Sequence, residues 1–350
     1  MEDFRLNISQ SEFRNPKYEE MIRFAHQALG LSESVSIGLS QLEGRGSDRT
    51  FYRLKWNQKG SAILIHYDSK RIENTYYADI AEFLRSINVP VPRLICHNPF
   101  MGVIVIEDLG DTDLWSLRGI PWKTRRVLYQ KTLIIVHRLH SFPEKEFPSG
   151  RVRLMNGFGP TLYRWEQDYF RDHLVRDVCG IKPEPSFERE LEAELFDLGE
   201  RLSKTRYCLI HRDLQSQNVM ILGGKPFLID FQGMRFGSSF YDLGSLLCDP
   251  YVNFSDSERD ELLSFYYGLW ERDVDWTTFK DTFWEASAQR LMQALGAYGF
   301  LGLKKELNVF LEHIPAGLHN LHRAAAQAPS LPRLRELSLA CEGEIEKKKR

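Results

Sequence analysis

The fold of this chain is decided by a stretch that reads His211-Arg212-Asp213-Leu214-Gln215-Ser216-Gln217-Asn218 and is followed by Asp230-Phe231-Gln232. It places a carboxylate at Asp213, a carboxamide at Asn218 and a second carboxylate at Asp230. Oxygen atoms of this kind are the ligands that hard divalent cations prefer. A polar turn ahead of an ordinary hairpin is the simpler alternative, because turns are also rich in Asp and Asn.

The residues between the two motifs predict a β-hairpin. Val219-Met220-Ile221-Leu222 is a short apolar run, Gly223-Gly224 is a turn signal, and Phe227-Leu228-Ile229 is a second apolar run. Such a hairpin would bring Asn218, at the start of one strand, beside Asp230, at the end of the other. Two oxygen ligands would then converge on one point in space.

The spacing of these residues is the one that a kinase fold uses to hold magnesium-ATP against a hydroxyl group. Phosphoryl transfer needs an acidic residue that orients the attacking hydroxyl and accepts its proton, and Asp213, one loop turn upstream of the hairpin, could supply it. It also needs oxygen ligands for magnesium, which Asn218 and Asp230 could supply. The motif therefore predicts a phosphotransferase with ATP and Mg²⁺ as cofactors.

The composition is that of an ordinary globular protein. The 350 residues are 43% hydrophobic and 27% charged, and the chain is long enough for two lobes. The formal net charge of −2 argues against a broadly basic nucleic-acid binder. The five cysteines are scattered without a Cys-x-x-Cys pair, so we expect small buried side chains in a reducing compartment. No signal peptide or membrane-spanning stretch is visible, and we expect a monomeric cytoplasmic protein without a membrane or nucleic-acid partner.

The hydrophobic pattern predicts an α+β, bilobal protein-kinase-like fold. Residues 1–107 would form a small β-rich N-lobe with one main helix at 73–86, carrying the nucleotide-binding sheet. Residues 108–350 would form a larger helical C-lobe with the catalytic loop and the acceptor site, interrupted only by the hairpin within 211–230. The strand candidates are 35–42, 50–56, 61–67, 94–96 and 103–107, and the other helical candidates are 15–29, 122–141, 161–178, 187–204, 258–272, 279–299 and 307–321.

Two further segments are candidates for nucleotide contacts. Between the first two strand candidates, Gly46 and Ser47 lie in a glycine-bearing loop whose N–H groups could approach phosphates, and Arg49 could add positive charge. A common glycine-bearing hairpin turn is the alternative. At the predicted lobe boundary, the backbone groups around Glu107 and Leu109 could meet the adenine edge, although an ordinary strand end would look similar.

The third strand candidate lacks the lysine that protein kinases place against the α- and β-phosphates. His66 stands at its end, and Lys70 and Arg71 follow shortly after. A lone histidine at a strand end is usually structural. The missing lysine leaves open a second class of function, a pseudokinase module that binds or regulates without efficient catalysis.

The segment after Asp230 argues for a small acceptor. Only eleven positions separate Asp230 from Tyr241, which leaves no room for the activation segment of a protein kinase. Asp242, at the start of a predicted helix, could be a buried acceptor that braces the catalytic loop through its backbone N–H groups or Arg212. An acidic residue placed at a helix N-terminus would look similar.

The chain resembles the aminoglycoside phosphotransferase and choline kinase superfamily. Within it, the chain is most similar to the bacterial cell-wall sugar kinases that phosphorylate N-acetylmuramate and N-acetylglucosamine at the anomeric hydroxyl. The resemblance covers nearly the whole chain. It is carried by residues 46–53, 89–92, 107–111, 211–213 with Asn218, 229–232, 241–243, 295–298 and 314–315.

The resemblance implies Asp213 as the catalytic base, Asn218 and Asp230 as magnesium ligands, and an amino-sugar acceptor contacted by Arg164 and Glu166. It also implies that a third-strand lysine is dispensable, since these sugar kinases do without one. The spacer 215–217 departs from the family's pattern, so an aminoglycoside, a choline-like alcohol or another metabolite stays open as the acceptor. The acids near the helix at 161–178 form no dense cluster of the kind that a polycationic aminoglycoside needs.

Overall fold

The computed structural model describes residues 16–42, 49–57, 60–270 and 274–349. The chain divides into two compact units, which we describe separately. The first comprises residues 1–111, 149–154 and 227–232, and the second comprises residues 112–148, 155–226 and 233–350. Two short segments far along the chain therefore return to the first unit, and one of them carries Asp230.

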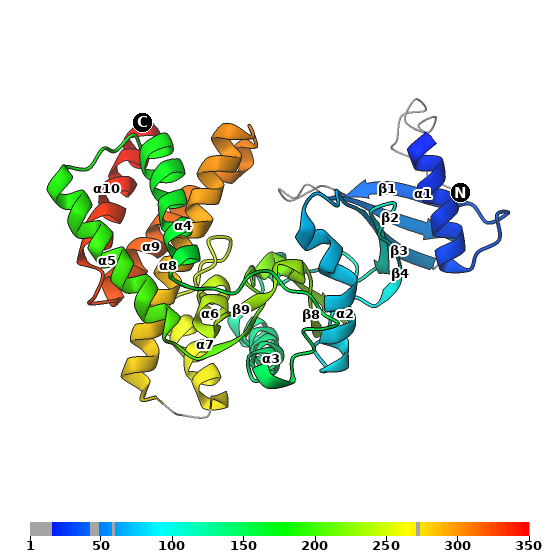
Figure 1. Cartoon of the computed structure of the whole chain (residues 1–350), viewed down its shortest axis with the longest axis horizontal. Helices are drawn as coiled ribbons and strands as arrows, with labels where there is room; N and C mark the ends of the chain where they lie inside the picture. Colours follow the sequence, from blue (N-terminus) through cyan, green and yellow to red (C-terminus); the bar gives the residue numbers. More distant parts are fainter. Residues whose placement is uncertain (1–15, 43–48, 58–59, 271–273, 350) are drawn as a thin grey trace. The chain divides into compact units, whose positions relative to one another are not determined.

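The first unit is built on a five-stranded antiparallel sheet (Figure 1), with the strand order β1-β2-β3-β5-β4. Its strands are β1 (Ile37–Leu42), β2 (Thr50–Trp56), β3 (Gly60–His66), β4 (Leu94–Asn98) and β5 (Val103–Glu107). All five were predicted from the sequence, and their ends differ from the prediction by at most two residues.

Side chains that alternate along the strands bury both faces of this sheet. On one face, Leu54, Leu64 and Val105 pack in a cluster with Met21 and Ala25 of α1 (Pro16–Leu29). The alternate positions of β3 and β5 are also apolar and buried, and they are Ile63, Ile65, Ile104 and Ile106. A sheet covered on both sides explains why these strands are continuous apolar runs in the sequence.

The helix predicted at 73–86 is a short 3₁₀ helix, η2 (Ile72–Tyr76), that continues as α2 (Tyr77–Ser86). The ring of Tyr77 lies against Phe231, with 4.6 Å between the ring centroids. The N–H of Leu228 donates to the main-chain oxygen of Pro90 at 2.9 Å. These contacts hold segment 227–232 in the first unit.

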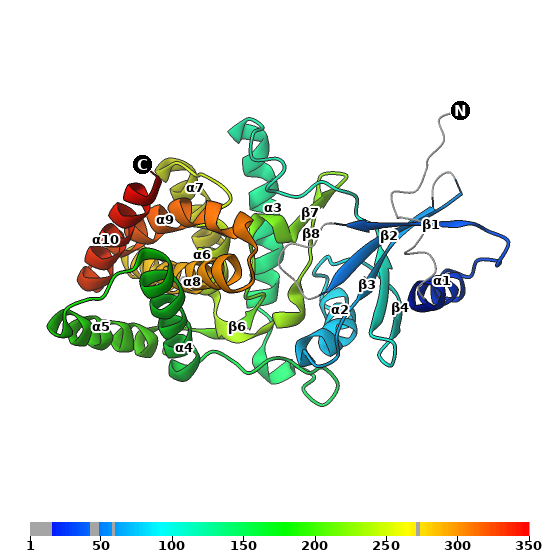
Figure 2. The ribbon, with the colours of Figure 1, turned by 90° about the horizontal axis from the view of Figure 1, so that it is seen from above.

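The second unit is mostly helical, and its longest helix, α8, packs against α4, α6 and α9 (Figure 2). All the helices predicted for this region are present. The helical segments are α3 (Trp122–His140), η3 (Glu144–Glu146), α4 (Pro160–Phe170), η4 (Arg171–Cys179), α5 (Pro185–Ser203), η5 (Ser216–Asn218), α6 (Ser239–Leu247), α7 (Asp256–Leu269), α8 (Trp276–Lys304), η7 (Asn308–His313), α9 (Ile314–Gln327) and α10 (Pro332–Lys349), and η6 (Phe231–Gly233) lies at the unit boundary.

The second unit also contains elements that the sequence did not predict. Strands β6 (Tyr207–Ile210) and β9 (Arg235–Ser238) pair antiparallel, so the prediction that only the hairpin interrupts the helices was wrong. Each strand has four residues, too few for a period-two pattern to stand out. Helix α10 was missed because its many charges hide a narrow apolar stripe at Leu334, Leu337 and Cys341.

The helix predicted at 161–178 changes its hydrogen-bond pattern halfway. The α-helix α4 ends at Phe170, and the chain continues as a π-helix, η4, to Cys179. Gly180 ends it with a φ of 75°, the left-handed conformation that glycine adopts most easily at a helix C-terminus.

The hairpin predicted after Asn218 is confirmed. Strands β7 (Val219–Leu222) and β8 (Lys225–Leu228) form a two-stranded sheet. The two glycines at its turn have φ values of 57° and 70°, which a type I′ turn requires at both central positions. The boundary between the units falls within β8, so Asn218 belongs to the second unit and Asp230 to the first.

Two features that bear on the cellular environment are visible in the structure. Four cysteines are buried and Cys96 is half-buried, and all five are free thiols, as expected from their scatter in the sequence. Among the residues that the structure describes, no helix has the length and apolar character needed to cross a membrane.

Candidate active site

The first half of the catalytic loop is held by Asp242, a buried residue in the first turn of α6. Its two carboxylate oxygens accept the N–H groups of His211, at 2.7 Å, and Arg212, at 2.8 Å. One of them also contacts Nε2 of His140 at 3.0 Å. The prediction that Asp242 braces the loop through its backbone N–H groups is therefore confirmed.

The second half of the loop is held by Asp249, just beyond the end of α6. One of its oxygens accepts the N–H and the hydroxyl of Ser216, at 2.7 and 2.5 Å, and the other accepts the N–H of Tyr251 at 2.9 Å. Burial raises the pKa of Asp249, and these hydrogen bonds oppose the rise. Sequence analysis missed this residue, although an aspartate directly after the apolar run of α6 is a signal for a buried acceptor.

Within the loop, Asn218 is tied to the residue predicted as the catalytic base. Its Nδ2 donates to the main-chain oxygen of Asp213 at 2.8 Å, and the N–H of Gln215 donates to the same oxygen at 2.9 Å. Arg212, just before, has a φ of 76°, a conformation that needs support from its surroundings. Because the Asn218 nitrogen is engaged, its side-chain oxygen is the atom that would bind a cation.

The side chain of Asp213 is paired with Arg290, which comes from the middle of α8. Nη2 of Arg290 donates to Oδ1 of Asp213 at 2.7 Å, and its other nitrogens donate to Ser245 Oγ at 3.2 Å and to Gln293 Oε1 at 2.5 Å. The Arg290 side chain is 4% exposed, and that of Asp213 is 33% exposed. Burial is the largest effect and opposes the charge on Arg290, but the charge of Asp213, together with smaller effects of two tyrosines and Glu166, outweighs it and the pKa of Arg290 is raised.

Arg290 was not predicted from the sequence. The signal that could have found it is an arginine inside a long apolar stretch of helix, because a buried cation needs an anionic partner. The sequence does not say which of the 48 acidic residues that partner is.

Glu166, predicted to contact the acceptor, lies inside the second unit and is 1% exposed. Its Oε1 accepts the hydroxyl of Tyr241 at 2.8 Å, and its Oε2 accepts Nε2 of Gln289 at 3.0 Å. Burial raises the pKa of Glu166, and the charge of Arg212 and the two hydrogen bonds oppose the rise. In this arrangement Glu166 ties α4 to α6 and α8 and has no open surface, so contact with an acceptor would require these bonds to change.

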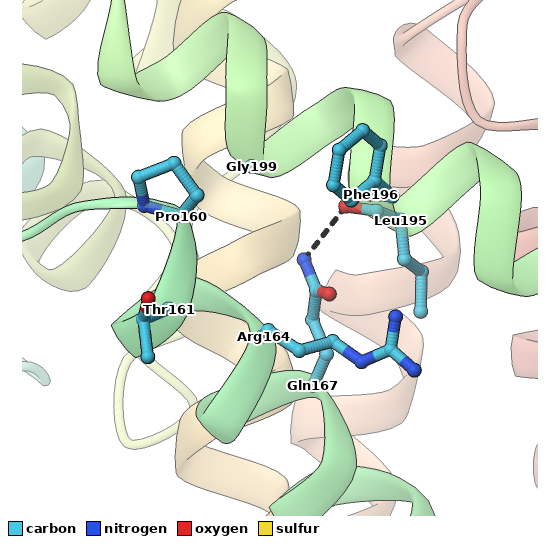
Figure 3. A pocket seen from close by; sticks show the side chains of 7 residues that line it. All are labelled: Pro160, Thr161, Arg164, Gln167, Leu195, Phe196 and Gly199. Atoms are coloured by element: carbon cyan, nitrogen blue, oxygen red, sulfur yellow. Dashed lines mark hydrogen bonds between the residues drawn. The ribbon is translucent and has the colours of Figure 1, made fainter.

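Arg164, the other residue predicted to contact the acceptor, lies on the exposed side of α4. It lines a pocket of about 370 Å³ between α4 and α5, shown in Figure 3. The pocket is lined by Pro160, Thr161, Arg164, Gln167, Leu195, Phe196 and Gly199. Because Arg164 and Glu166 are two positions apart on one helix, they face different surroundings.

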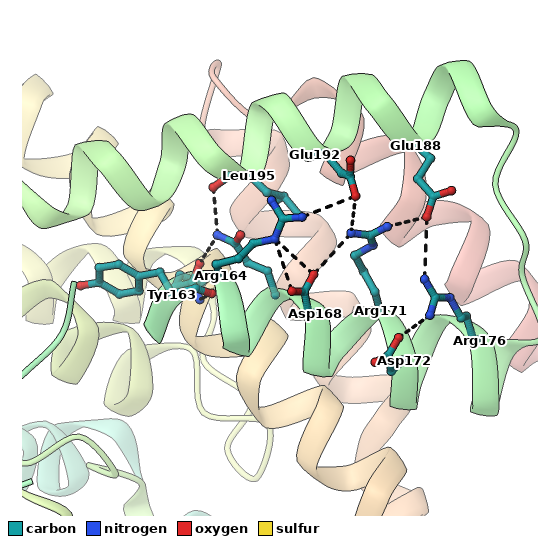
Figure 4. Close-up of polar contacts among 11 residues, drawn as sticks. Tyr163, Arg164, Asp168, Arg171, Asp172, Arg176, Glu188, Glu192 and Leu195 are labelled. Carbon is teal, nitrogen blue, oxygen red and sulfur yellow. Dashed lines mark hydrogen bonds and ion pairs between the residues drawn. The ribbon is translucent and has the colours of Figure 1, made fainter. Parts of the chain in front are cut away.

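Arg164 also belongs to a chain of ion pairs between the α4–η4 helix and α5, drawn in Figure 4. It lies 3.3 Å from Asp168 and 3.5 Å from Glu192. Arg171 continues the chain to Asp168 and Glu192, at 3.4 and 3.0 Å, and to Glu188. The Arg164 side chain is 42% exposed, so these contacts are screened by solvent and add little stability each.

In the first unit, Asp230 forms an ion pair with Arg49 through Oδ1 and Nη2. The same Oδ1 accepts Nε2 of Gln232 at 2.9 Å. The side chain of Arg49 is 9% exposed and that of Asp230 is 28% exposed. Asp230 has a φ of 64°, which turns its carboxylate out of the line of the preceding strand.

Of the remaining residues predicted to bind nucleotide, Glu107 has defined hydrogen bonds. The N–H of Glu107 donates to the main-chain oxygen of Arg93 at 2.9 Å, and Oε2 of Glu107 accepts the N–H of Arg93 at 3.1 Å. The N–H of Glu107 is therefore engaged, and an adenine contact would fall to its carbonyl and to the N–H of Leu109. Gly46 and Ser47 lie outside the described residues.

The residues predicted to bind magnesium fit that ion by their chemistry. Over the described parts of the chain, no group of three or more His, Cys, Asp and Glu side chains is placed to hold a metal ion. Magnesium does not need such a cage, since proteins commonly hold it with one or two carboxylates together with substrate phosphates. Asn218 offers a carboxamide oxygen and Asp230 a partly exposed carboxylate, which are both suitable donors.

Comparison with known proteins shows the family. A family model described as "Phosphotransferase enzyme family" matches residues 38–277, more than half of the chain. N-acetylmuramate/N-acetylglucosamine kinase from Neisseria meningitidis serogroup B is 22% identical over 318 residues, which cover 85% of this chain and 89% of that protein. The protein of the same name from Pseudomonas aeruginosa is 24% identical over 315 residues, which cover 85% of this chain and 88% of that protein.

A solved structure confirms the predicted class of fold. The ADP-bound aminoglycoside phosphotransferase APH(2'')-Ib has a TM-score of 0.60 and 13% sequence identity, over 90% of this chain and 99% of that one. Both contain a small antiparallel sheet with few helices and a larger helical part, as in kinases. The likeness concerns the fold alone, and the matched family model shows that the chain belongs to the phosphotransferase enzyme family.

Proposed function

We propose that this phosphotransferase is an ATP-dependent kinase that phosphorylates the anomeric hydroxyl of an N-acetylated amino sugar, with N-acetylmuramate and N-acetylglucosamine as the expected acceptors. The two relatives described above are named N-acetylmuramate/N-acetylglucosamine kinase and align with most of the chain. A role in the recycling of cell-wall sugars would follow from these acceptors.

The observation that carries the proposal is the Asp213–Arg290 ion pair within a braced loop. The pair engages Oδ1 of Asp213, so Oδ2 is the atom that would orient the acceptor hydroxyl and accept its proton. The braces from Asp242 and Asp249 hold the loop before substrate binds. A base fixed in advance loses little freedom when the reaction begins, and this lowers the barrier.

The nucleotide side of the proposal uses the residues predicted from the sequence. Asn218 and Asp230 would hold magnesium, which neutralises the phosphate oxygens when it is bound. The carbonyl of Glu107 and the N–H of Leu109 would hold the adenine edge. Gly46, Ser47 and Arg49 would contact the phosphates.

A test of this function measures ADP release by the purified chain with magnesium-ATP and a panel of acceptors. N-acetylmuramate and N-acetylglucosamine should be phosphorylated, whereas the methyl glycoside of N-acetylglucosamine, whose anomeric oxygen is blocked, should not. Turnover of the blocked glycoside would contradict an anomeric site. Turnover only with choline or an aminoglycoside would contradict an amino sugar as the acceptor. ATP binding without any turnover would favour a pseudokinase.

A further inference from the structure

The first unit contains an arginine, Arg49, at a position where the sequence patterns of protein kinases do not place a cation. Protein kinases hold the α- and β-phosphates with a lysine on the third strand, and this lysine pairs with a glutamate on the following helix. β3 of this chain reads Gly60-Ser61-Ala62-Ile63-Leu64-Ile65-His66 and contains no lysine. Its four central residues, 62–65, are apolar and buried, so none of them presents a cation.

The partner of that lysine is missing as well. The buried residues of α2 are Tyr77, Ala78, Ile80, Ala81, Phe83 and Leu84, none of which is acidic. Tyr77 is the residue that packs on Phe231, next to Asp230. Its burial raises the pKa of the Tyr77 phenol, with smaller opposite effects of Arg49 and Asp230. The neutral phenol of Tyr77 therefore lies on the α2 side of Phe231. The described residues of β3 and the buried residues of α2 form no lysine–glutamate pair.

Arg49 lies next to the position where the lysine is expected. Thr50, the first residue of β2, pairs in register with His66, the last residue of β3. Arg49 directly precedes β2 and is thus one residue beyond this pair. Its guanidinium lies 5.4 Å from the centroid of the Phe51 ring and reaches Asp230.

Three other cations among the described residues of this region either pair with other carboxylates or are exposed. Arg53 is held by Asp108 at 2.8 Å and Asp111 at 2.7 Å. Arg71 is 52% exposed and lies 3.7 Å from Glu73, and Lys70 is exposed. Among the described ion pairs of the first unit, the one that reaches Asp230 is made by Arg49.

We propose that Arg49 replaces the third-strand lysine and alternates between two anionic partners. In the ligand-free chain it neutralises Asp230. When magnesium and nucleotide bind, the guanidinium transfers to phosphate oxygens and the Asp230 carboxylate is released for the metal. A guanidinium suits this role because it stays charged and its paired N–H groups match phosphate oxygens.

Charge balance explains why the exchange is favourable. The Arg49 side chain is only 9% exposed, so it can leave Asp230 only when another anion receives it. Magnesium replaces the positive charge that Asp230 loses, and the phosphates provide a new anion for Arg49. The inference rests on the proposed function only in that the chain must bind ATP.

The inference is tested by nucleotide binding, which needs no turnover. Dissociation constants for ATP, ADP and AMP are measured by calorimetry with magnesium for the wild type, Arg49→Gln, Arg49→Lys and Arg71→Gln. Arg49→Gln should weaken ATP binding about tenfold or more, as the loss of a charged hydrogen bond predicts, with a smaller effect on ADP and little on AMP. Arg49→Lys should keep most of the affinity, and the exposed control Arg71→Gln should stay within about twofold of the wild type.

A second variant tests the exchange itself. Without magnesium, in EDTA, Asp230→Asn should bind ATP more tightly than the wild type, because the Asp230 carboxylate no longer competes with the phosphates for Arg49. The double variant Asp230→Asn with Arg49→Gln should lose this gain, since the two side chains are coupled. Asp230→Asn keeps the inference testable even if Arg49→Gln fails to fold.

Several results would overturn the inference. Equal weakening of ATP and AMP by Arg49→Gln would mean that Arg49 only supports the fold, and unchanged ATP binding would mean that it has no role. A gain in Asp230→Asn that persists in the double variant would also contradict it. A wild type that binds ATP but phosphorylates no acceptor refutes the proposed function alone, whereas a wild type that binds no ATP refutes both.

Discussion

The two carboxylate-bearing segments of the candidate site are held in different ways. In the second unit, loop 211–218 is held by backbone N–H groups that donate to the buried carboxylates of Asp242 and Asp249. In the first unit, Asp230 is held by the side chains of Arg49 and Gln232 and is 28% exposed. The loop is therefore built into the core of its unit, whereas Asp230 is held by contacts that can exchange.

This difference matches the two tasks that phosphoryl transfer sets. A base works best when its position is settled before the substrate arrives, because ordering it later would raise the barrier. A metal ligand must accept a new partner each time nucleotide binds and release it afterwards. Buried hydrogen bonds from the backbone suit the first task, and an ion pair between two side chains, in which a cation and an anion of the substrate can replace the partners, suits the second.

The largest expected effect is on the base itself. Asp213→Asn should lower kcat by about 10³-fold, within the range for loss of a general base, because the amide keeps the contact with Arg290 but cannot accept a proton. Steady-state kinetics with the best acceptor would measure kcat, and calorimetry would measure ATP affinity. A normal kcat, or a loss of ATP binding as large as the loss of turnover, would contradict the role.

A smaller effect is expected for Arg290, which acts on the reaction through Asp213. Arg290→Met should lower kcat by about 10²-fold, as a small displacement of a catalytic group does, while the KM for ATP stays near the wild-type value. Arg290→Lys should recover part of the rate because it keeps the charge. Equal rates for the Met and Lys variants would show that Arg290 only fills space.

The contrast between the two segments can be tested directly by removing one carboxylate from each. Asp249→Asn should lower the free energy of unfolding by about 2 kcal/mol, since buried N–H and hydroxyl donors lose a charged acceptor. Asp230→Asn should lower it less, by about 1 kcal/mol, because the amide oxygen can still accept Nε2 of Gln232. Chemical denaturation of both variants measures the two free energies of unfolding. Similar losses for the two would show that loop 211–218 and Asp230 are held equally firmly.

The free energy of unfolding should depend on pH because Glu166 is buried. Its pKa is raised in the folded chain, so the folded state holds a proton that the unfolded state has already released. The contribution of Glu166 to stability is therefore greatest at low pH and falls as pH rises from the usual glutamate range through the folded pKa. The stability lost in Glu166→Gln should accordingly be larger at about pH 5 than at about pH 8.

Thermal unfolding of the wild type and Glu166→Gln at both pH values measures this difference. Arg164→Ala, on the exposed side of the same helix, is the control and should change the free energy of unfolding by about 0.5 kcal/mol or less at either pH. A loss for Glu166→Gln that grows with pH would contradict the raised pKa.

Much of the fold could be predicted from the sequence because its signals are local. The five strands of the first sheet, the hairpin at 219–228 and the long helices of the second unit other than α10 follow from hydrophobic periods and turn residues within a few positions of one another. Asp242 could be predicted to hold the catalytic loop because residues 241–243 follow the hairpin shortly after in the sequence. The residues Asp213, Asn218 and Asp230 were found as a spaced set for the same reason.

What the sequence determined by itself is the set of chemical groups and the elements that carry them. Only the tertiary structure decided which groups meet: Asp213 with Arg290, 77 positions apart in the sequence, Ser216 with Asp249, and Asp230 with Arg49. The physical reason is that an ion pair or a buried hydrogen bond depends on distance in space and on burial. Neither quantity is encoded in any short window of residues, whereas helix and strand periods are.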